Sequence, residues 1–339
     1  MNAGGDPAPD ATYGDPVLDL DRPVTDRLLL RTVPGAVDYL AEELRELPTA
    51  GIVGRRHDGV VIEFAGPLRD LAANRYYTTL AVLTADDAGI ARSRESGALA
   101  AVPEPPRFRV GRLGERRWPL RDRLTASGWR NAPGDWDVNF EPDPEGTAAE
   151  LGGMYWTSRF GELVRAPAST TPVIATVMLR LAKVQEGQRV LDPFCGAGTL
   201  LVEAARGGAG RLLGADHDRR WVRSTRENLA GAHPPVTLWR GDARALPLPD
   251  DHVDRVVANL PFGKRVGSHR GNTTLYPAAL AEIARVLTRT GRAVLLTEDK
   301  RLFTETVQRT RGVRIVKQIT FTTGGAHPSA YVVTTRRGR

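Results

Sequence analysis

From about Thr171 onward, short apolar stretches alternate along the chain with longer stretches in which apolar residues recur at helical intervals. The predicted strands of this alternation are RVLDPF, RLLGADHD, VTLWRGDA, VDRVVANL and RAVLLTED. Apolar strands separated by amphipathic helices are typical of a parallel sheet that helices cover on both faces. Two further predicted strands, VRIVKQITFTT and AYVVTTR, have no helix between them and predict an antiparallel hairpin at the end of the order. The pattern therefore predicts an α/β domain in the second half of the chain.

Four of the predicted strands end on a polar side chain: Asp192, Asp216, Asp242 and Asn259. The carboxyl ends of parallel strands meet at one edge of an open sheet, and α/β proteins bind ligands in the crevice there. Asp216 follows Asp192 by 24 residues, a spacing that lets a carboxylate accept hydrogen bonds from ribose hydroxyls. The Asp242 carboxylate could accept a hydrogen bond from the exocyclic amine of a purine.

A glycine-containing turn, with Gly196 and Gly198, follows the strand that ends at Asp192, and a helix begins near Thr199. Glycines let a backbone approach a ligand closely, and a helix N-terminus favours negative charge. The dinucleotide-binding fingerprint is incomplete, because Leu201 occupies its third glycine position. A phosphate-binding P-loop is excluded, because no Gly-Lys-Ser/Thr follows.

Taken together, DPFCGAGTLLVEAA, GADHD and RGDARALPLPDDHVDRVVANLPFG resemble the class I S-adenosylmethionine-dependent methyltransferases, whose sheet is Rossmann-like and seven-stranded. The resemblance implies S-adenosyl-L-methionine as cofactor, with Asp192 on its amino group, Asp216 on the ribose and Asp242 on the adenine. The other cofactor-lining residues that it implies are Pro193, Cys195, Gly196, Gly198, Thr199, His217, Ala243 and Asn259. Methylation of a pyrimidine carbon needs a cysteine at the base. Cys195 lies in the cofactor turn instead, so we expect it to be a small buried residue.

The sequence Asn259-Leu260-Pro261-Phe262 suits methyl transfer to the exocyclic amine of a nucleobase, whose lone pair is delocalised into the ring. The Asn259 side-chain oxygen and the Leu260 carbonyl would accept the two amine hydrogens and direct the lone pair toward the methyl group. Pro261 would fix the turn, and the Phe262 ring would stack on the base. A base treated in this way must be flipped out or already single-stranded.

This motif resembles the Asn/Asp-Pro-Pro-Tyr/Phe signature of amino-methyltransferases, with Leu260 in place of the first proline. The longer run NLPFGKRVGSHRGNTTLYPAALAEIARVL is similar to the THUMP-domain tRNA guanine-N2-methyltransferases. The resemblance implies methylation of the N2 amine of a guanosine in tRNA, in the acceptor stem. It also implies RNA contacts by Lys264, Arg265, Arg107, Arg109, Arg116, Arg117 and Arg130.

The first half of the chain predicts a smaller α+β region, and LLLRTVPGAVDYLAEEL is similar to the start of the ferredoxin-like region of that family. The expected units are a flexible acidic tail (1–26), a ferredoxin-like domain (27–106), a THUMP-like RNA-binding module (107–165) and the methyltransferase domain (166–339). Residues 95–106, rich in Ala and Pro, are expected to form a linker.

The net charge of +7 suggests a polyanionic partner, and we expect this to be tRNA. One cysteine, no apolar run of membrane-spanning length and no signal peptide indicate a cytoplasmic protein that contacts no membrane. The six histidines show no metal-ligand spacing, so no metal is expected, and the chain is expected to be a monomer.

Other substrates remain compatible with the motifs: guanine in ribosomal RNA, or adenine N6 and cytosine N4 in DNA. A non-catalytic RNA-binding protein that retains a methyltransferase fold is the alternative of another class.

Overall fold

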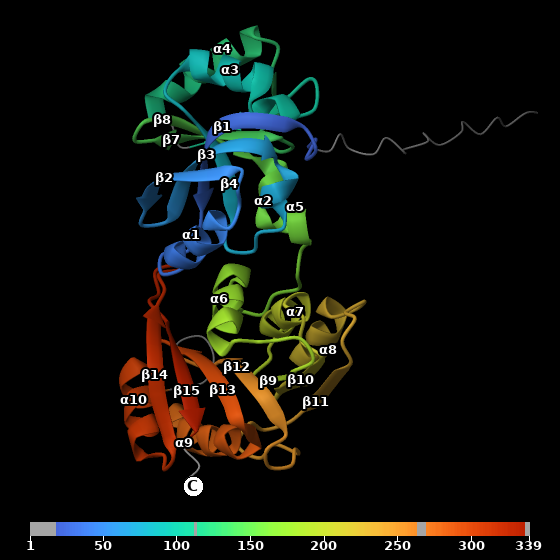
Figure 1. Ribbon diagram of the computed structural model, residues 1–339, viewed down its shortest axis with the longest axis vertical. Helices are drawn as coiled ribbons and strands as arrows, with labels where there is room; N and C mark the ends of the chain where they lie inside the picture. Colours follow the sequence, from blue (N-terminus) through green and yellow to red (C-terminus); the bar gives the residue numbers. More distant parts are fainter. Residues whose placement is uncertain (1–17, 112–113, 263–268, 336–339) are drawn as a thin grey trace, which may run out of the picture.

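Two sheets of different construction follow one another along the chain in the computed structural model (Figure 1). The structure describes residues 18–111, 114–262 and 269–335. The N-terminal sheet has eight strands and the C-terminal sheet has seven, and the two sheets lie end to end along the long axis of the molecule.

The N-terminal sheet has the strand order β2-β3-β1-β4-β8-β7-β5-β6. Its strands are β1 (Pro23–Arg31), β2 (Ala50–Arg56), β3 (Gly59–Pro67), β4 (Thr79–Thr84), β5 (Arg107–Val110), β6 (Arg130–Asn131), β7 (Val138–Asp143) and β8 (Gly146–Leu151). Its helices are α1 (Val37–Arg45), α2 (Arg69–Ala72), α3 (Asp87–Ser96), α4 (Arg117–Ala126) and α5 (Trp156–Phe160). Neighbouring strands are antiparallel except at β5, which is parallel to both β6 and β7.

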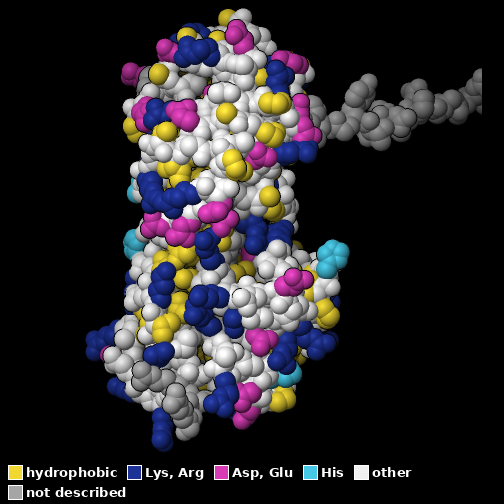
Figure 2. Space-filling view, viewed as in Figure 1, with side chains coloured by type: hydrophobic (Ala, Val, Ile, Leu, Met, Phe, Trp, Pro, Cys, Tyr) yellow, Lys and Arg dark blue, Asp and Glu magenta, His cyan; other side chains and the backbone are white. Residues whose placement is uncertain are grey.

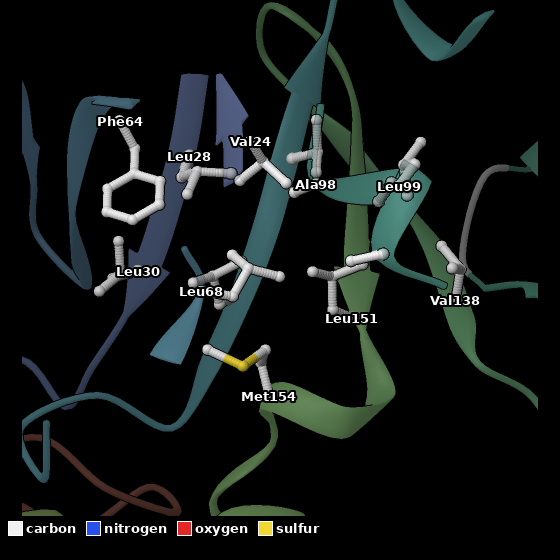
Figure 3. Packing of buried hydrophobic residues seen from close by; sticks show 14 of the residues in the cluster. Val24, Leu28, Leu30, Phe64, Leu68, Ala98, Leu99, Val138, Leu151 and Met154 are labelled. Carbon is white, nitrogen blue, oxygen red and sulfur yellow. The ribbon is translucent and has the colours of Figure 1, made fainter. Parts of the chain in front are cut away.

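The segments 27–106 and 107–165 contribute to one continuous sheet, because β4 of the first segment pairs with β8 of the second. They also share one hydrophobic core. Leu28 and Leu68 of the first segment belong to the same buried cluster as Val138, Leu151 and Met154 of the second (Figure 3). The aromatic rings of Phe108, Trp129 and Phe140 extend this core with edge-to-face contacts at centroid distances of 5.6 to 6.2 Å.

The predicted tail and the predicted linker both contain ordered structure. β1 begins at Pro23 and Val24 is buried, so the ordered sheet starts inside the predicted tail of residues 1–26. The predicted linker 95–106 contains a 3₁₀ turn, Ala98–Ala101, that packs against β1, and Leu99 is fully buried. A segment rich in Ala and Pro has the composition of a linker, but its small side chains also allow a turn to pack closely against a strand.

The C-terminal sheet has the strand order β11-β10-β9-β12-β13-β15-β14. Its strands are β9 (Arg189–Asp192), β10 (Arg211–Asp216), β11 (Val236–Arg240), β12 (Val253–Asn259), β13 (Leu287–Thr297), β14 (Val313–Thr320) and β15 (Ser329–Thr335). The first five strands of this order are parallel, and β15 is antiparallel to both β13 and β14. The predicted parallel sheet and its terminal antiparallel hairpin are thereby confirmed.

Helices cover this sheet on both faces. They are α6 (Pro172–Ala182), α7 (Thr199–Arg206), α8 (Arg219–Asn228), α9 (His269–Val286) and α10 (Lys300–Arg309). Along β12, Val257 belongs to a buried cluster with α6 and α7, whereas Val256 and Ala258 belong to a second cluster with α9 and α10. Residues that alternate along one strand thus bury against different helices, as a doubly covered sheet requires.

The two sheets are joined by buried contacts as well as by the chain. Val33 and Ala36 of the N-terminal region lie in the same apolar cluster as Phe321, which follows β14. Gly35 has a φ of +98°, and a Cβ at this position would lie 2.3 Å from the Thr320 carbonyl oxygen. Only glycine therefore permits this close approach.

A buried carboxylate on α7 adds a polar contact between the two regions. Glu203 is fully buried, and its Oε2 accepts hydrogen bonds from Arg75 of the N-terminal region (3.2 Å) and from Thr176 of α6 (3.1 Å). Its Oε1 accepts from Arg206 (2.6 Å). Hydrogen-bond donors surround this buried carboxylate, and its contact with Arg75 joins the N-terminal region to α7.

Within the described residues, no helix combines the length and the apolar character that crossing a bilayer demands.

Candidate functional site

The turn between β9 and α7 has the backbone shape of a ligand cradle. Gly198 has a φ of +85°, and a Cβ there would lie 2.7 Å from Thr225 Cγ2, so both conformation and space require glycine. Gly196 has a φ of +51°, but a Cβ there would point into open space. The Thr225 hydroxyl donates to the Gly196 carbonyl at 2.6 Å and fixes the turn against α8. Room for a ligand therefore lies beside Gly196.

Asp216, at the end of β10, holds this turn from the neighbouring strand. Its Oδ2 accepts from the Gly196 N–H (3.0 Å) and its Oδ1 from the Asp218 N–H (2.9 Å). The side chain of His217 is exposed, with Nδ1 3.2 Å from Asp216 Oδ1. The carboxylate is thus oriented by backbone donors while its remaining lone pairs stay available to a ligand hydroxyl.

Asp192, at the end of β9, is only 1% exposed. Burial raises the pKa of its carboxyl well above the ordinary value, and the nearby Asp216 carboxylate adds to the rise. A hydrogen bond from the Phe194 N–H, 3.0 Å from Oδ1, offsets part of it. A buried carboxylate of this kind would be stabilised by a ligand cation.

Asp242 lies two residues beyond the end of β11 and is half exposed. The Arg244 side chain donates to both of its carboxylate oxygens, with distances of 2.6 to 3.0 Å, and holds its pKa below the ordinary value. Ala243 beside it is buried. Asp242 is therefore ionised, and it follows β11, the outermost strand of the parallel part of the sheet.

The other predicted residues of the turn are small or apolar. Cys195 is buried, and burial raises the pKa of its thiol, so it stays protonated and is not poised as a nucleophile. Its sulfur is 3.5 Å from the Thr225 hydroxyl. Thr199 begins α7 and is buried, and Pro193 lies within the turn.

Asn259 ends β12, the strand next to β9, so Asp192, Asp216 and Asn259 occupy the carboxyl ends of three adjacent parallel strands. The Asn259 Nδ2 donates to the Ala168 carbonyl at 3.0 Å. Its Oδ1 is shielded from solvent, yet no group in the described part of the chain donates to it. A buried acceptor without a donor is uncommon in folded proteins and indicates a place where a ligand donor can bind.

The segment before α6 contributes to the site although no sequence motif marks it. Ala168, whose carbonyl orients the Asn259 amide, has a φ of +147°, which is strained for any residue with a Cβ. The Asn228 side chain accepts from the Val164 N–H (2.9 Å) and donates to the carbonyls of Val164 and Ala197, each at 2.8 Å. The segment is thereby linked through Asn228 to the turn between β9 and α7 and is hydrogen-bonded to Asn259.

The rest of the motif forms a turn that packs on both sides of the sheet. The Leu260 N–H donates to the Leu296 carbonyl (2.9 Å), and the Leu260 side chain is buried in the cluster with α9. Phe262 is partly buried and packs against the opposite cluster. The Pro261 carbonyl accepts from Asn272 and Tyr276 of α9.

The predicted RNA-binding residues differ in their surroundings: two make contacts within the protein, two are exposed, and three lie outside the described residues in whole or in their side chains. The guanidinium of Arg107 pairs with Asp135 and Asp137, and that of Arg109 donates to Asn139 and lies 4.1 Å from the Trp136 ring centroid. Arg117 and Arg130 are exposed. Lys264, Arg265 and the side chain of Arg116 lie outside the described residues.

The described residues contain no group of three or more His, Cys, Asp or Glu side chains placed to hold a metal ion. The groups described at the carboxyl ends of these strands are carboxylates, one side-chain amide, backbone carbonyls and an aromatic ring.

Residues 163–329 match the family model described as RMKL-like, methyltransferase domain. These residues form a methyltransferase domain of that family. The matched residues include the cradle, the strand-end carboxylates and the Asn259 motif.

The methyltransferase domain is also similar to named relatives. The tRNA (guanine(6)-N(2))-methyltransferase THUMP3 of Homo sapiens is 34% identical over 183 residues, 49% of this chain and 36% of that protein. The tRNA (guanine(6)-N2)-methyltransferase of Thermus thermophilus is 37% identical over 171 residues, 49% of this chain and 50% of the relative. The alignments thus span about a third to a half of the length of these curated relatives.

The likeness in structure extends beyond the methyltransferase domain. The crystal structure of TrmN from Thermus thermophilus matches with a TM-score of 0.72 at 27% identity, covering 91% of this chain and 99% of that one. The N-terminal sheet is therefore part of the shared architecture.

Proposed function

We propose that this chain transfers the methyl group of S-adenosylmethionine to the N2 amine of a guanosine in the acceptor stem of tRNA. The observation that carries the proposal is the Asn259 Oδ1 atom, a buried acceptor without a donor at the carboxyl end of β12. The printed names of the human and Thermus relatives, which are tRNA guanine-N2-methyltransferases, support the choice of substrate.

The residues at the strand ends fit S-adenosylmethionine. The Asp192 carboxylate, buried and raised in pKa, suits the amino group of the methionine part, and Asp216 suits the ribose hydroxyls. The open space beside Gly196 leaves room for the cofactor against the backbone. Asp242 would accept from the adenine amine with the oxygen lone pairs that Arg244 leaves unused.

The chain's own part in the reaction is to orient the base amine. Asn259 Oδ1 accepts one N2 hydrogen and the Leu260 carbonyl accepts the other, so the nitrogen lone pair is turned toward the methyl group. When bound, S-adenosylmethionine supplies an electrophilic methyl group on a sulfonium, which becomes a neutral thioether as the methyl bonds to N2 and one N2 proton passes to solvent. Phe262 offers a ring face on which the flipped base can stack.

The N-terminal region carries a surface suited to single-stranded RNA around α4, at the end distant from the methyltransferase domain (Figure 1). Figure 2 shows Lys and Arg side chains beside hydrophobic ones at this end of the molecule. Trp118 of α4 is 53% exposed, and the guanidinium groups of Arg117 and Arg121 lie 5.2 Å and 4.7 Å from its ring centroid. These side chains line a hollow of about 220 Å³ together with Asn131 of β6. An exposed aromatic ring beside arginines can stack on a base and contact its phosphate.

We expect Trp118→Ala to weaken tRNA binding about tenfold, because stacking of one base contributes about 1–3 kcal/mol. Arg117→Ala should weaken binding by a similar amount and should lower the salt dependence of the binding constant by about one phosphate contact. Filter binding or fluorescence anisotropy with tRNA at several salt concentrations measures both quantities.

Arg123→Ala is the matched control, because Arg123 is also an exposed arginine of α4 but is paired with Asp87 at 2.5 Å. It should leave the tRNA affinity within about twofold of the unchanged protein. If all three substitutions weakened binding equally, the effect would come from net charge, and the proposed surface around Trp118 would be wrong.

The substrate assignment is tested by incubating the purified protein and a labelled methyl donor with separate pools of tRNA, ribosomal RNA and DNA. The proposal predicts label in tRNA. Label in DNA alone would contradict it, and label in ribosomal RNA alone would retain the chemistry but change the substrate.

A further inference from the structure

Two side chains of α9 converge on one carbonyl of the motif turn. Asn272 Nδ2 donates to the Pro261 carbonyl oxygen at 2.7 Å, and the Tyr276 hydroxyl donates to the same oxygen at 2.7 Å. The two residues are four apart and therefore lie on one face of the helix. Asn272 is 1% exposed and Tyr276 is 2% exposed, so water does not compete for these bonds.

The direction of the bonds follows from the hydrogens available. The Tyr276 oxygen is also 2.9 Å from the Thr297 hydroxyl, and Thr297 is fully buried. Because a carbonyl only accepts and Tyr276 has one hydroxyl hydrogen, Tyr276 donates to Pro261 and Thr297 donates to Tyr276. The Thr297 oxygen in turn accepts from the Asp299 N–H at 3.0 Å. The end of β13 and α9 thus hold the turn through a directed chain of hydrogen bonds.

These bonds bear on the second acceptor of the proposed reaction, the Leu260 carbonyl. The Leu260 N–H is fixed to the Leu296 carbonyl at 2.9 Å, and the next residue, Pro261, has a ring that restricts its φ. With the Pro261 carbonyl also held, the peptide group between Leu260 and Pro261 is restrained on both sides. The restraint compensates for a leucine where amino-methyltransferases carry a first proline.

We propose that Asn272 and Tyr276 are positioning residues for methyl transfer. They hold the Pro261 carbonyl so that the Leu260 carbonyl and the Asn259 amide oxygen face the same amine. This inference rests on the proposed function, because it concerns the orientation of the amine acceptor site. Neither residue touches the reacting atoms, so their effect is expected on the rate of transfer rather than on the binding of either substrate.

The test is Tyr276→Phe, which removes the hydroxyl and keeps the ring against Phe303, whose centroid lies 6.3 Å away. We expect kcat for methyl transfer to fall about tenfold, because small displacements of reacting groups are costly. The cofactor Kd and the KM for tRNA should stay within about twofold. Adding Asn272→Ala should lower kcat further, because both bonds act on one oxygen.

Tyr331→Phe is the matched control. Tyr331 is similarly buried and also packs against Phe303, at 4.7 Å between ring centroids, but its hydroxyl interacts with Thr304 and Ser329 instead of the Pro261 carbonyl. It should keep the kcat of the unchanged protein. An equal fall in kcat for both variants, or a normal kcat for Tyr276→Phe, would overturn the inference.

Amide hydrogen exchange separates this inference from the proposed function, because it needs no substrate. The Leu260 amide should exchange about tenfold faster in Tyr276→Phe and unchanged in Tyr331→Phe. Faster exchange with no transfer by the unchanged protein to any nucleic acid would reject the proposed function but retain the restraint that α9 places on the motif backbone. Unchanged exchange in Tyr276→Phe would reject the positioning role itself.

Discussion

Asn259→Ala is expected to lower methyl transfer by at least about 10² to 10³-fold while leaving cofactor affinity within about twofold. The substitution removes Oδ1, the buried oxygen to which no described group donates, and with it one of two acceptors for the base amine. In the proposed site the cofactor would be held mainly by Asp192 and Asp216 on the neighbouring strands, so its affinity should depend little on the Asn259 side chain. Single-turnover kinetics with tRNA and calorimetry with S-adenosylmethionine measure the two effects.

Thr288→Val controls for the loss of a buried polar atom as such. Thr288 Oγ1 also lacks a partner within the described residues, but Thr288 is the second residue of β13 and lies at the opposite edge of the sheet. It should keep normal transfer. Retained turnover in Asn259→Ala would remove Asn259 from the catalytic role.

The orientation of the Asn259 amide predicts the behaviour of a second variant. In Asn259→Asp, a carboxylate oxygen would replace the Nδ2 that now donates to the Ala168 carbonyl at 3.0 Å. Two acceptors would then face each other, so most of the transfer should be lost at neutral pH. Activity should recover in part at lower pH, where the protonated acid can donate to Ala168.

Asp192→Asn is expected to weaken cofactor binding about 100-fold, because it removes the carboxylate that would pair with the methionine amino group. The affinity of the unchanged protein should fall as the pH drops through the raised pKa of Asp192, since the ionised form binds the cation. The variant should lack this pH dependence. Calorimetry across a pH series measures both.

Asp192→Asn should weaken cofactor binding, but it should not lower the stability of the fold. A carboxyl whose pKa is raised in the folded state is most favourable to folding below its unfolded pKa, and this contribution is lost as the pH rises through the folded pKa. Asp192→Asn should therefore equal or exceed the unchanged protein in stability at neutral pH. A thermal or denaturant unfolding series tests this.

Asp254→Asn serves as the control for the affinity measurement. Asp254 is a carboxylate of the same sheet, at the start of β12, and accepts from the Arg189 N–H at 2.9 Å. It lies at the edge opposite the proposed site, so its substitution should leave cofactor affinity unchanged. Equal loss of affinity in both variants would argue against a specific role for Asp192.

The methyltransferase sheet could be predicted because its signals are local. Strand–helix alternation and the spacing of Asp192, Asp216 and Asn259 determine which side chains meet at the carboxyl edge, whatever the details of packing. The bounds of the strands in the N-terminal half were harder to predict from the sequence. β2 contains Gly51, Gly54 and two arginines, so it lacks the apolar alternation that predicts a strand.

Contacts between distant segments were not predictable from motifs. Arg107 and Arg109 lie in a basic stretch, but their partners are about 30 residues further along the chain. Ala168 takes part in the site only through its backbone carbonyl, which leaves no trace in the residue type. Asn272 and Tyr276 are four residues apart on the helix after the motif, so the sequence places them on one helix face. It does not show that this face meets the Pro261 carbonyl, which only the structure reveals.

If Asn259 and Leu260 present a guanosine N2 amine to the cofactor, the methylated nucleoside must be N2-methylguanosine. Purified protein, tRNA and S-adenosylmethionine are incubated, and the tRNA is digested and analysed by nucleoside mass spectrometry. We expect the unchanged protein to form N2-methylguanosine and Asn259→Ala to form none. Methylation of another atom or nucleoside, or N2-methylguanosine formed equally by Asn259→Ala, would contradict it.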